Sequence, residues 1–159
     1  MFDAMSDERP RGLASDSLVE TAEGPVVMSE TPNKGFAVLT RLPSGQLGFR
    51  QLIKVLSQDA VPLVRVTLDS GHSVVAAAGH PFFRKGMQAT AAADLRPGDP
   101  LETAFRYPDG YLPAGITKAP NAWGISVTAV EPAGEGPVMT GTVRDTHALF
   151  VTAGILCGE

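Results

Sequence analysis

The chain has 159 residues, of which 43% are hydrophobic and 19% charged, which predicts one soluble globular domain with a sizeable core. Its net charge of -4 gives no electrostatic footprint for nucleic acid or an anionic membrane, and no apolar run is long enough to cross a bilayer. The single cysteine, Cys157, excludes an internal disulfide and a cysteine-rich zinc site. We expect a monomeric, cytoplasmic protein that binds neither a metal nor another cofactor.

The first third of the chain predicts short strands joined by tight turns. Residues 1–11 are charged and have no apolar period, which predicts a flexible leader or flanking segment. Residues 17–28 form two apolar runs around a turn at residues 22–24, and further strands are predicted over 36–41 and 47–57. Glycine and proline separate these runs, which favours turns over helices.

A hairpin over residues 64–80 is the clearest local feature of the sequence. Val64, Val66 and Leu68 alternate with polar residues, as in a half-buried strand, and Gly71 supplies the turn. The second strand ends at the sequence Gly79-His80-Pro81. A histidine at a strand end, between glycine and proline, is a candidate for chemistry, although a buried structural histidine has the same pattern.

The remainder of the chain continues the pattern of short strands. The alanine-rich stretch 89–96 predicts the only helix of any length, which Pro97-Gly98 would stop. A strand is predicted from residue 100, a surface insertion rich in Pro, Gly and Tyr over 105–122, and strands over 123–132, 136–144 and 147–157. About ten short strands with frequent turns predict an all-β, strongly curved fold.

Five stretches follow one another in an order typical of a known family. They are residues 12–26, 35–41, 77–83, 87–101 and 137–156, and they include Gly35-Phe-Ala-Val-Leu-Thr-Arg, Ala93-Asp-Leu-Arg-Pro-Gly-Asp and Asp145-Thr-His-Ala-Leu-Phe. From residue 12 to residue 159 the chain resembles the Hint fold shared by inteins, hedgehog autoprocessing domains and bacterial intein-like domains. The resemblance implies a horseshoe of curved strands with pseudo-twofold hairpins and at most one or two short helices.

The resemblance also implies a chemistry, which is cleavage of the chain's own peptide bonds. A Cys or Ser at the first position attacks the preceding carbonyl, and a histidine protonates the departing amide nitrogen. At the other end an Asn cyclises onto its own carbonyl. The partners would be the flanking polypeptide segments.

Several family positions carry other residues in this sequence. His80 and His147 match the family histidines, but the nucleophile position is Gly12, and the threonine three residues before His80 is Ala77. The family aspartate aligns with Thr140, with Asp145 nearby, and Cys157-Gly158-Glu159 stands where a hydrophobic residue, His and Asn are expected. Because glycine cannot form an ester or thioester, we predict an intein-like domain that is inactive or severely impaired in splicing.

Two other functions are compatible with the sequence. The chain could be a non-catalytic β-rich structural or interaction module of a larger phage or toxin-like protein. Alternatively, a hydrolase could use Cys157 with a histidine, provided that a nearby charge lowers the pKa of the thiol.

Overall fold

The computed structural model describes residues 9–33, 36–103 and 125–159. Within these ranges the chain forms one antiparallel sheet and short 3-10 turns, which confirms the predicted all-β class. No helix of the described residues is long and apolar enough to span a membrane. The insertion predicted over 105–122 lies outside the described residues.

The strands follow the chain in the order predicted, with some merged. Their bounds are β1 Leu13–Ala14, β2 Leu18–Thr21, β3 Gly24–Val27, β4 Ala37–Arg41, β5 Leu47–Leu68, β6 Ser73–Ala77, β7 Pro81–Arg84, β8 Gln88–Ala91, β9 Pro100–Leu101, β10 Ile125–Val143, β11 Ala148–Phe150 and β12 Leu156–Gly158. The 3-10 turns are η2 Met28–Asn33 and η3 Ala92–Asp94.

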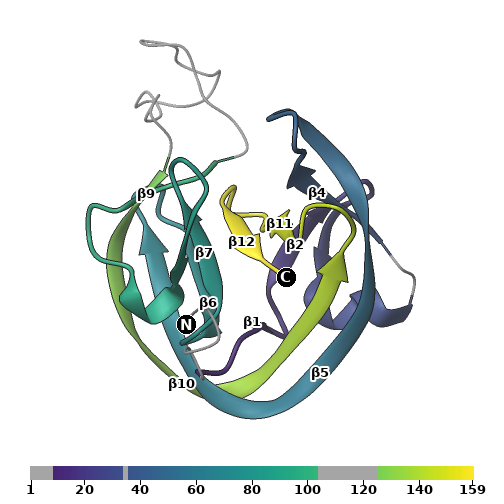
Figure 1. The fold of residues 1–159 in the computed structure, drawn as a ribbon. Helices are drawn as coiled ribbons and strands as arrows, with labels where there is room; N and C mark the ends of the chain where they lie inside the picture. The colour runs from purple at the N-terminus through teal and green to yellow at the C-terminus, as the bar shows by residue number, and fades with distance from the viewer. Residues whose placement is uncertain (1–8, 34–35, 104–124) are drawn as a thin grey trace, which may run out of the picture.

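Two long strands frame the molecule. β5 has 22 residues and β10 has 19, and they pair antiparallel along most of their length. Their pairing register shifts at several points, for example between Pro132 and Glu135, and such bulges let a paired ribbon bend. In Figure 1 the two strands curve together around the base of a horseshoe.

Both ends of the described chain enter the middle of this frame. β1 pairs with β6 on one side and with β10 on the other. β12 pairs with β7 and β11, and the C end lies between the two arms of the horseshoe in Figure 1. Segments from opposite ends of the sequence therefore meet near the junction of β6 and β7.

The hydrophobic core fills the concave interior. In the predicted hairpin, Val66 and Leu68 are buried in the same cluster as Leu13, while Arg65 is exposed and Thr67 is part-exposed. The apolar side chains of the alternating pattern therefore face the core, as the sequence predicts. The turn between β5 and β6 lies at residues 69–72, as predicted.

Three sequence predictions need correction. The alanine stretch is not a helix, because residues 88–91 pair with β7 as β8 and only a single 3-10 turn follows. Sheet pairing overrides the helix preference of alanine here. The strands predicted over 47–57 and 64–68 form one continuous strand, β5, and those over 123–132 and 136–144 form one strand, β10.

Candidate functional site

A β-turn at the end of β6 positions His80. The His80 N–H donates to the carbonyl of Ala77 at 3.0 Å, which closes the turn, and Pro81 then starts β7. The His80 carbonyl accepts the N–H of Ala92 at 2.9 Å, and the ring packs edge-on against Phe82. The backbone on both sides of the histidine is therefore fixed, as the flanking Gly and Pro predict.

The His80 ring joins segments from the two ends of the chain. The Gly12 N–H donates to His80 Nδ1 at 3.0 Å, and His80 Nε2 lies 3.0 Å from the Gly158 carbonyl oxygen. A backbone N–H can only donate and a carbonyl can only accept, so Nδ1 is unprotonated and Nε2 carries the proton. The ring is therefore neutral and held in a single tautomer.

His80 is fully buried, which sets its protonation. Burial disfavours the charged ring and lowers the pKa of His80 from its ordinary 6.5 to about 4. The hydrogen bond to the Gly158 carbonyl raises this pKa and the charge of Arg11 lowers it, both with smaller effect than burial. At pH 7 the neutral ring therefore predominates.

Gly12 occupies a position where a side chain does not fit. Its φ is +130°, a conformation that L side chains rarely adopt. A Cβ at this position would lie 2.8 Å from the Val138 Cβ, 2.9 Å from the Val138 Cγ2 and 3.1 Å from the Met139 carbonyl oxygen. The wall formed by β10 therefore leaves no room for the sulfur or oxygen of a nucleophile.

Two other predicted positions, Ala77 and Thr140, form no side-chain hydrogen bond with Gly12 among the described residues. Ala77 is buried and contacts the site through its backbone, with its N–H donating to the Gly12 carbonyl at 2.9 Å and its carbonyl accepting the His80 N–H. Thr140 is part-exposed and pairs with Leu56 along β10 and β5. Ala77 therefore holds the chain at Gly12 without offering a hydroxyl group.

The second predicted histidine belongs to a separate cluster next to Gly158. His147 Nδ1 lies 3.0 Å from the Glu159 Oε1, and the Val143 N–H donates to Glu159 Oε2 at 2.5 Å. The His147 side chain is 67% exposed, whereas that of Glu159 is 24% exposed. His80 thus contacts Gly12 directly, while His147 contacts the residue after Gly158.

Two further predicted site residues, Asp145 and Cys157, have other partners. Asp145 has φ +68°, is 66% exposed and forms an ion pair with Arg50 at 3.0 Å. Cys157 is fully buried between its strand partners Leu149 and Phe82, and burial raises the pKa of its thiol. A buried thiol with a raised pKa does not supply the thiolate that the hydrolase alternative needs.

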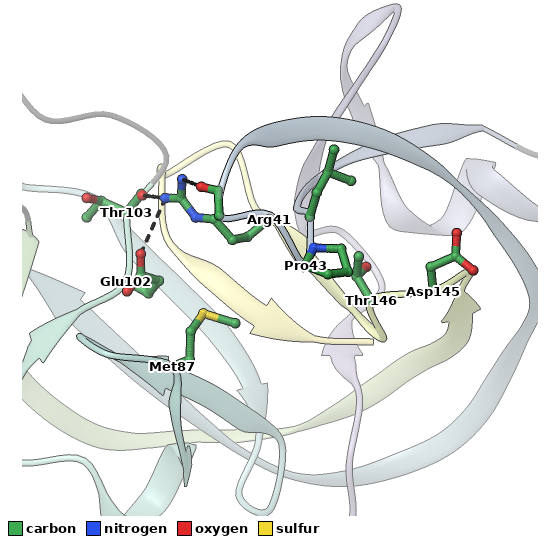
Figure 2. A pocket seen from close by; sticks show the side chains of 9 residues that line it. Arg41, Pro43, Met87, Glu102, Thr103, Asp145 and Thr146 are labelled. Atoms are coloured by element: carbon green, nitrogen blue, oxygen red, sulfur yellow. Dashed lines mark hydrogen bonds and ion pairs between the residues drawn. The ribbon is translucent and has the colours of Figure 1, made fainter.

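A more open cavity lies between the arms of the horseshoe. It has a volume of about 680 Å³, and among the described residues its lining does not include Gly12, His80 or Glu159. The Arg41 guanidinium donates to the Glu102 carboxylate at 3.3 Å and to the Thr103 carbonyl at 2.6 Å. Figure 2 shows both contacts, and the exposed side chain of Met87 also lines the cavity. These contacts occupy the guanidinium group within the protein, so we take the buried His80 junction as the candidate site.

The structure adds contacts that the sequence does not reveal. Val138, which blocks Gly12, and the Gly158 carbonyl, which holds His80, come from strands distant in sequence. The Asp94 carboxylate, at the end of the 3-10 turn η3, binds Arg9 from 85 positions away in the sequence. The sequence indicates these contacts only through the glycine before His80, because a glycine allows another segment of the backbone to approach closely.

Comparisons with solved structures agree with this architecture. A DnaB intein from Synechocystis sp. superposes with a TM-score of 0.72 at 15% identity, over 94% of this chain and 98% of that one. A bacterial intein-like domain from Clostridium thermocellum gives 0.74 at 16% identity, over 94% and 99%. A DnaX mini intein from Spirulina platensis gives 0.70 at 16% identity, over 93% and 99%.

No protein-family model and no curated protein matches the sequence. The structural likeness extends over nearly the whole length of each chain, and the all-β architecture is shared. The chain therefore has the Hint fold of inteins and intein-like domains.

Proposed function

We propose that this chain is an intein-like domain that keeps the chain path of an autoprocessing site but does not carry out the nucleophile-dependent acyl shift. The observation that carries the proposal is the contact of the His80 ring with the backbone of Gly12, at a position without a side chain. The segment before Gly12 and the residues up to Glu159 would be held in place rather than released.

The first reason is the missing nucleophile. In an acyl shift a side-chain oxygen or sulfur bonds to the carbonyl carbon of the preceding residue, the bond to the amide nitrogen breaks, and that nitrogen takes up a proton. The corresponding bond here joins Arg11 to Gly12, and Gly12 has no side-chain atom to form the new bond. The proximity of Val138 also opposes a rescue by substitution at this position alone.

The second reason is the protonation of His80. A general acid would have to give a proton to the Gly12 nitrogen, but Nδ1 is unprotonated and accepts a hydrogen bond from the Gly12 N–H instead. Because the Gly158 carbonyl keeps a proton on Nε2, donation from Nδ1 requires the doubly protonated ring. With a pKa of about 4, about one molecule in a thousand carries that ring at pH 7.

The third reason is the chemistry at residue 159. Asn cyclisation needs a side-chain amide nitrogen, and Glu159 offers only carboxylate oxygens. Both oxygens already have partners, His147 Nδ1 and the Val143 N–H. The carboxylate therefore ties this segment to the end of β10 and to the turn before β11.

A fusion assay tests the proposal. The chain is placed between two tagged soluble proteins and incubated at pH 7 with and without a thiol, and intact and cleaved species are separated on a gel. We expect the intact fusion to persist under both conditions, as it would in a His80→Ala control. Cleavage next to Gly12 in the unmodified sequence, abolished by His80→Ala, would overturn the proposal.

A further inference from the structure

We propose that Gly79 and Asp94 form a recognition site for the extended segment that precedes Gly12, and that Asp94 selects an arginine at the third position before it. The occupant in this chain is the segment of residues 9–11. The inference deepens the proposed function. It rests on that function only where residues 9–11 are taken as the segment that precedes a former cleavage point.

The backbone of the segment pairs with the end of β6. The Gly79 N–H donates to the Pro10 carbonyl at 2.9 Å, and the Ala77 N–H donates to the Gly12 carbonyl, also at 2.9 Å. Alternate residues of the chain, Pro10 and Gly12, thus bond to alternate residues at the end of β6 and in the turn that follows it. This is the pattern of an extended peptide that adds to a strand, in which the main chain provides affinity.

Gly79 is a glycine because the segment lies directly against it. A Cβ at residue 79 would lie 2.7 Å from the Arg9 carbonyl oxygen, 2.8 Å from the Arg9 Cβ and 2.8 Å from the Pro10 carbonyl oxygen. Unlike Gly12, Gly79 is not among the residues with positive φ. The requirement for glycine here is therefore close approach of the segment and not backbone conformation.

Asp94 provides the side-chain contact. Its two carboxylate oxygens accept hydrogen bonds from the two terminal nitrogens of Arg9, at 2.9 and 2.8 Å, although the residues are 85 positions apart in the sequence. This fork-to-fork geometry is specific to arginine, because a lysine has one point charge. Asp94 therefore distinguishes arginine from lysine as well as from neutral residues.

The Asp94 carboxylate is connected to the same turn as His80. Asp94 ends η3, whose Ala92 and Ala93 N–H groups donate to the carbonyls of His80 and Ala78 at 2.9 and 3.0 Å. Recognition of Arg9 and the contact of His80 with Gly12 therefore share one rigid support. A segment held at Arg9 and Pro10 delivers residue 12 to the histidine.

Limited proteolysis by trypsin tests the inference, because trypsin cleaves after arginine but not before proline. The bond between Arg9 and Pro10 resists, so cleavage between Arg11 and Gly12 reports release of the segment. Mass spectrometry would follow this cleavage, with cleavage after Arg65 in β5 as the measure of global opening. The full chain is used throughout.

We expect Asp94→Asn to raise the initial cleavage rate after Arg11 about 2- to 5-fold, the range of a part-exposed ion pair. Gly79→Ala should raise it about 10-fold or more, because the segment can no longer approach. The matched control is Asp59→Asn, which removes an exposed carboxylate on β5, away from this segment, and should leave the cleavage rate unchanged. Arg9→Lys should behave like Asp94→Asn.

A charge exchange separates recognition from general damage to the fold. Arg9→Asp and Asp94→Arg should each increase cleavage after Arg11, and the double variant should restore part of the protection. Equal cleavage in the wild type and in Asp94→Asn, or a double variant no better protected than the single ones, would overturn the inference. Self-cleavage of the tagged fusion would refute the proposed function but leaves this trypsin comparison unaffected.

Discussion

Lowering the pH should destabilise this fold through His80. The unfolded chain binds a proton at this histidine near the ordinary pKa of 6.5, whereas the buried ring in the folded protein binds it only near pH 4. Between these values the unfolded state carries a proton that the folded state does not. Stability therefore rises as the pH increases from 4 to 6.5, and the contribution is constant above that window.

The pKa difference sets the size of the effect. A shift from 6.5 to about 4, at 1.36 kcal/mol per pH unit, corresponds to about 3 kcal/mol of unfolding free energy. The full burial of the ring justifies this conversion, because solvent does not screen it. Protonation would also remove the acceptor for the Gly12 N–H.

Urea unfolding at a series of pH values between 4 and 7, at constant ionic strength, measures this effect. The His80→Gln variant has no titrating group at residue 80, so its free energy should lack the increment of about 3 kcal/mol. His72→Gln, at the exposed turn between β5 and β6, is the matched control and should keep the increment. Carboxylates titrate in all three proteins, so their effect cancels in the comparison.

The reasoning would be refuted by equal pH dependence in the wild type and in His80→Gln. A stability that falls as the pH rises from 4 to 6.5, specifically through His80, would refute it as well. Either result would mean that the folded protein holds a charged ring between Gly12 and Gly158.

The remaining predictions concern the two ends of the site. Gly12→Ala should lower the free energy of unfolding in urea by about 2–5 kcal/mol, because it combines a positive φ with a clash against Val138. Gly24→Ala, at a positive φ in open space, should lower it by only about 1–2 kcal/mol. Equal losses in the two variants would contradict the clash with Val138. Gly12→Cys should therefore form no thiol-releasable product in the fusion. Glu159→Ala should lower the unfolding free energy by about 1 kcal/mol, more than Glu159→Gln, which can still accept the Val143 N–H. Cys157 should react with iodoacetamide only in urea, and rapid alkylation of the native protein would contradict its burial.

The hairpin and most strand positions follow from the sequence because their signals are local. Alternation at Val64, Val66 and Leu68 sets the buried face, and Gly71 sets the turn. The alanines before Pro97 fit a strand or a helix equally, and contacts with β7 decide between them. The continuity of β5 and β10 also depends on mutual pairing, since each strand supports the other across its prolines.

The site was predictable only in part. The motif around His80 identifies the histidine, and the family resemblance aligns Gly12 with the nucleophile position; the two residues are in contact in the structure. The partner of His147 is the Glu159 carboxylate. This contact depends on how the strands pack in the folded chain, and the spacing of residues in the sequence does not predict it. The packing of Val138 against Gly12 and the ion pair of Arg9 with Asp94 likewise depend on long-range contacts that no local pattern encodes.

Nitrogen NMR of the His80 ring tests most directly whether this histidine holds both ends of the site in a non-donating state. At pH 7 we predict one tautomer, with a proton on Nε2 facing Gly158 and an unprotonated Nδ1 facing Gly12. The same spectrum should persist until the pH approaches 4. A proton on Nδ1 at pH 7 would place His80 ready to donate to the Gly12 nitrogen and would contradict the proposed arrest of the acyl shift.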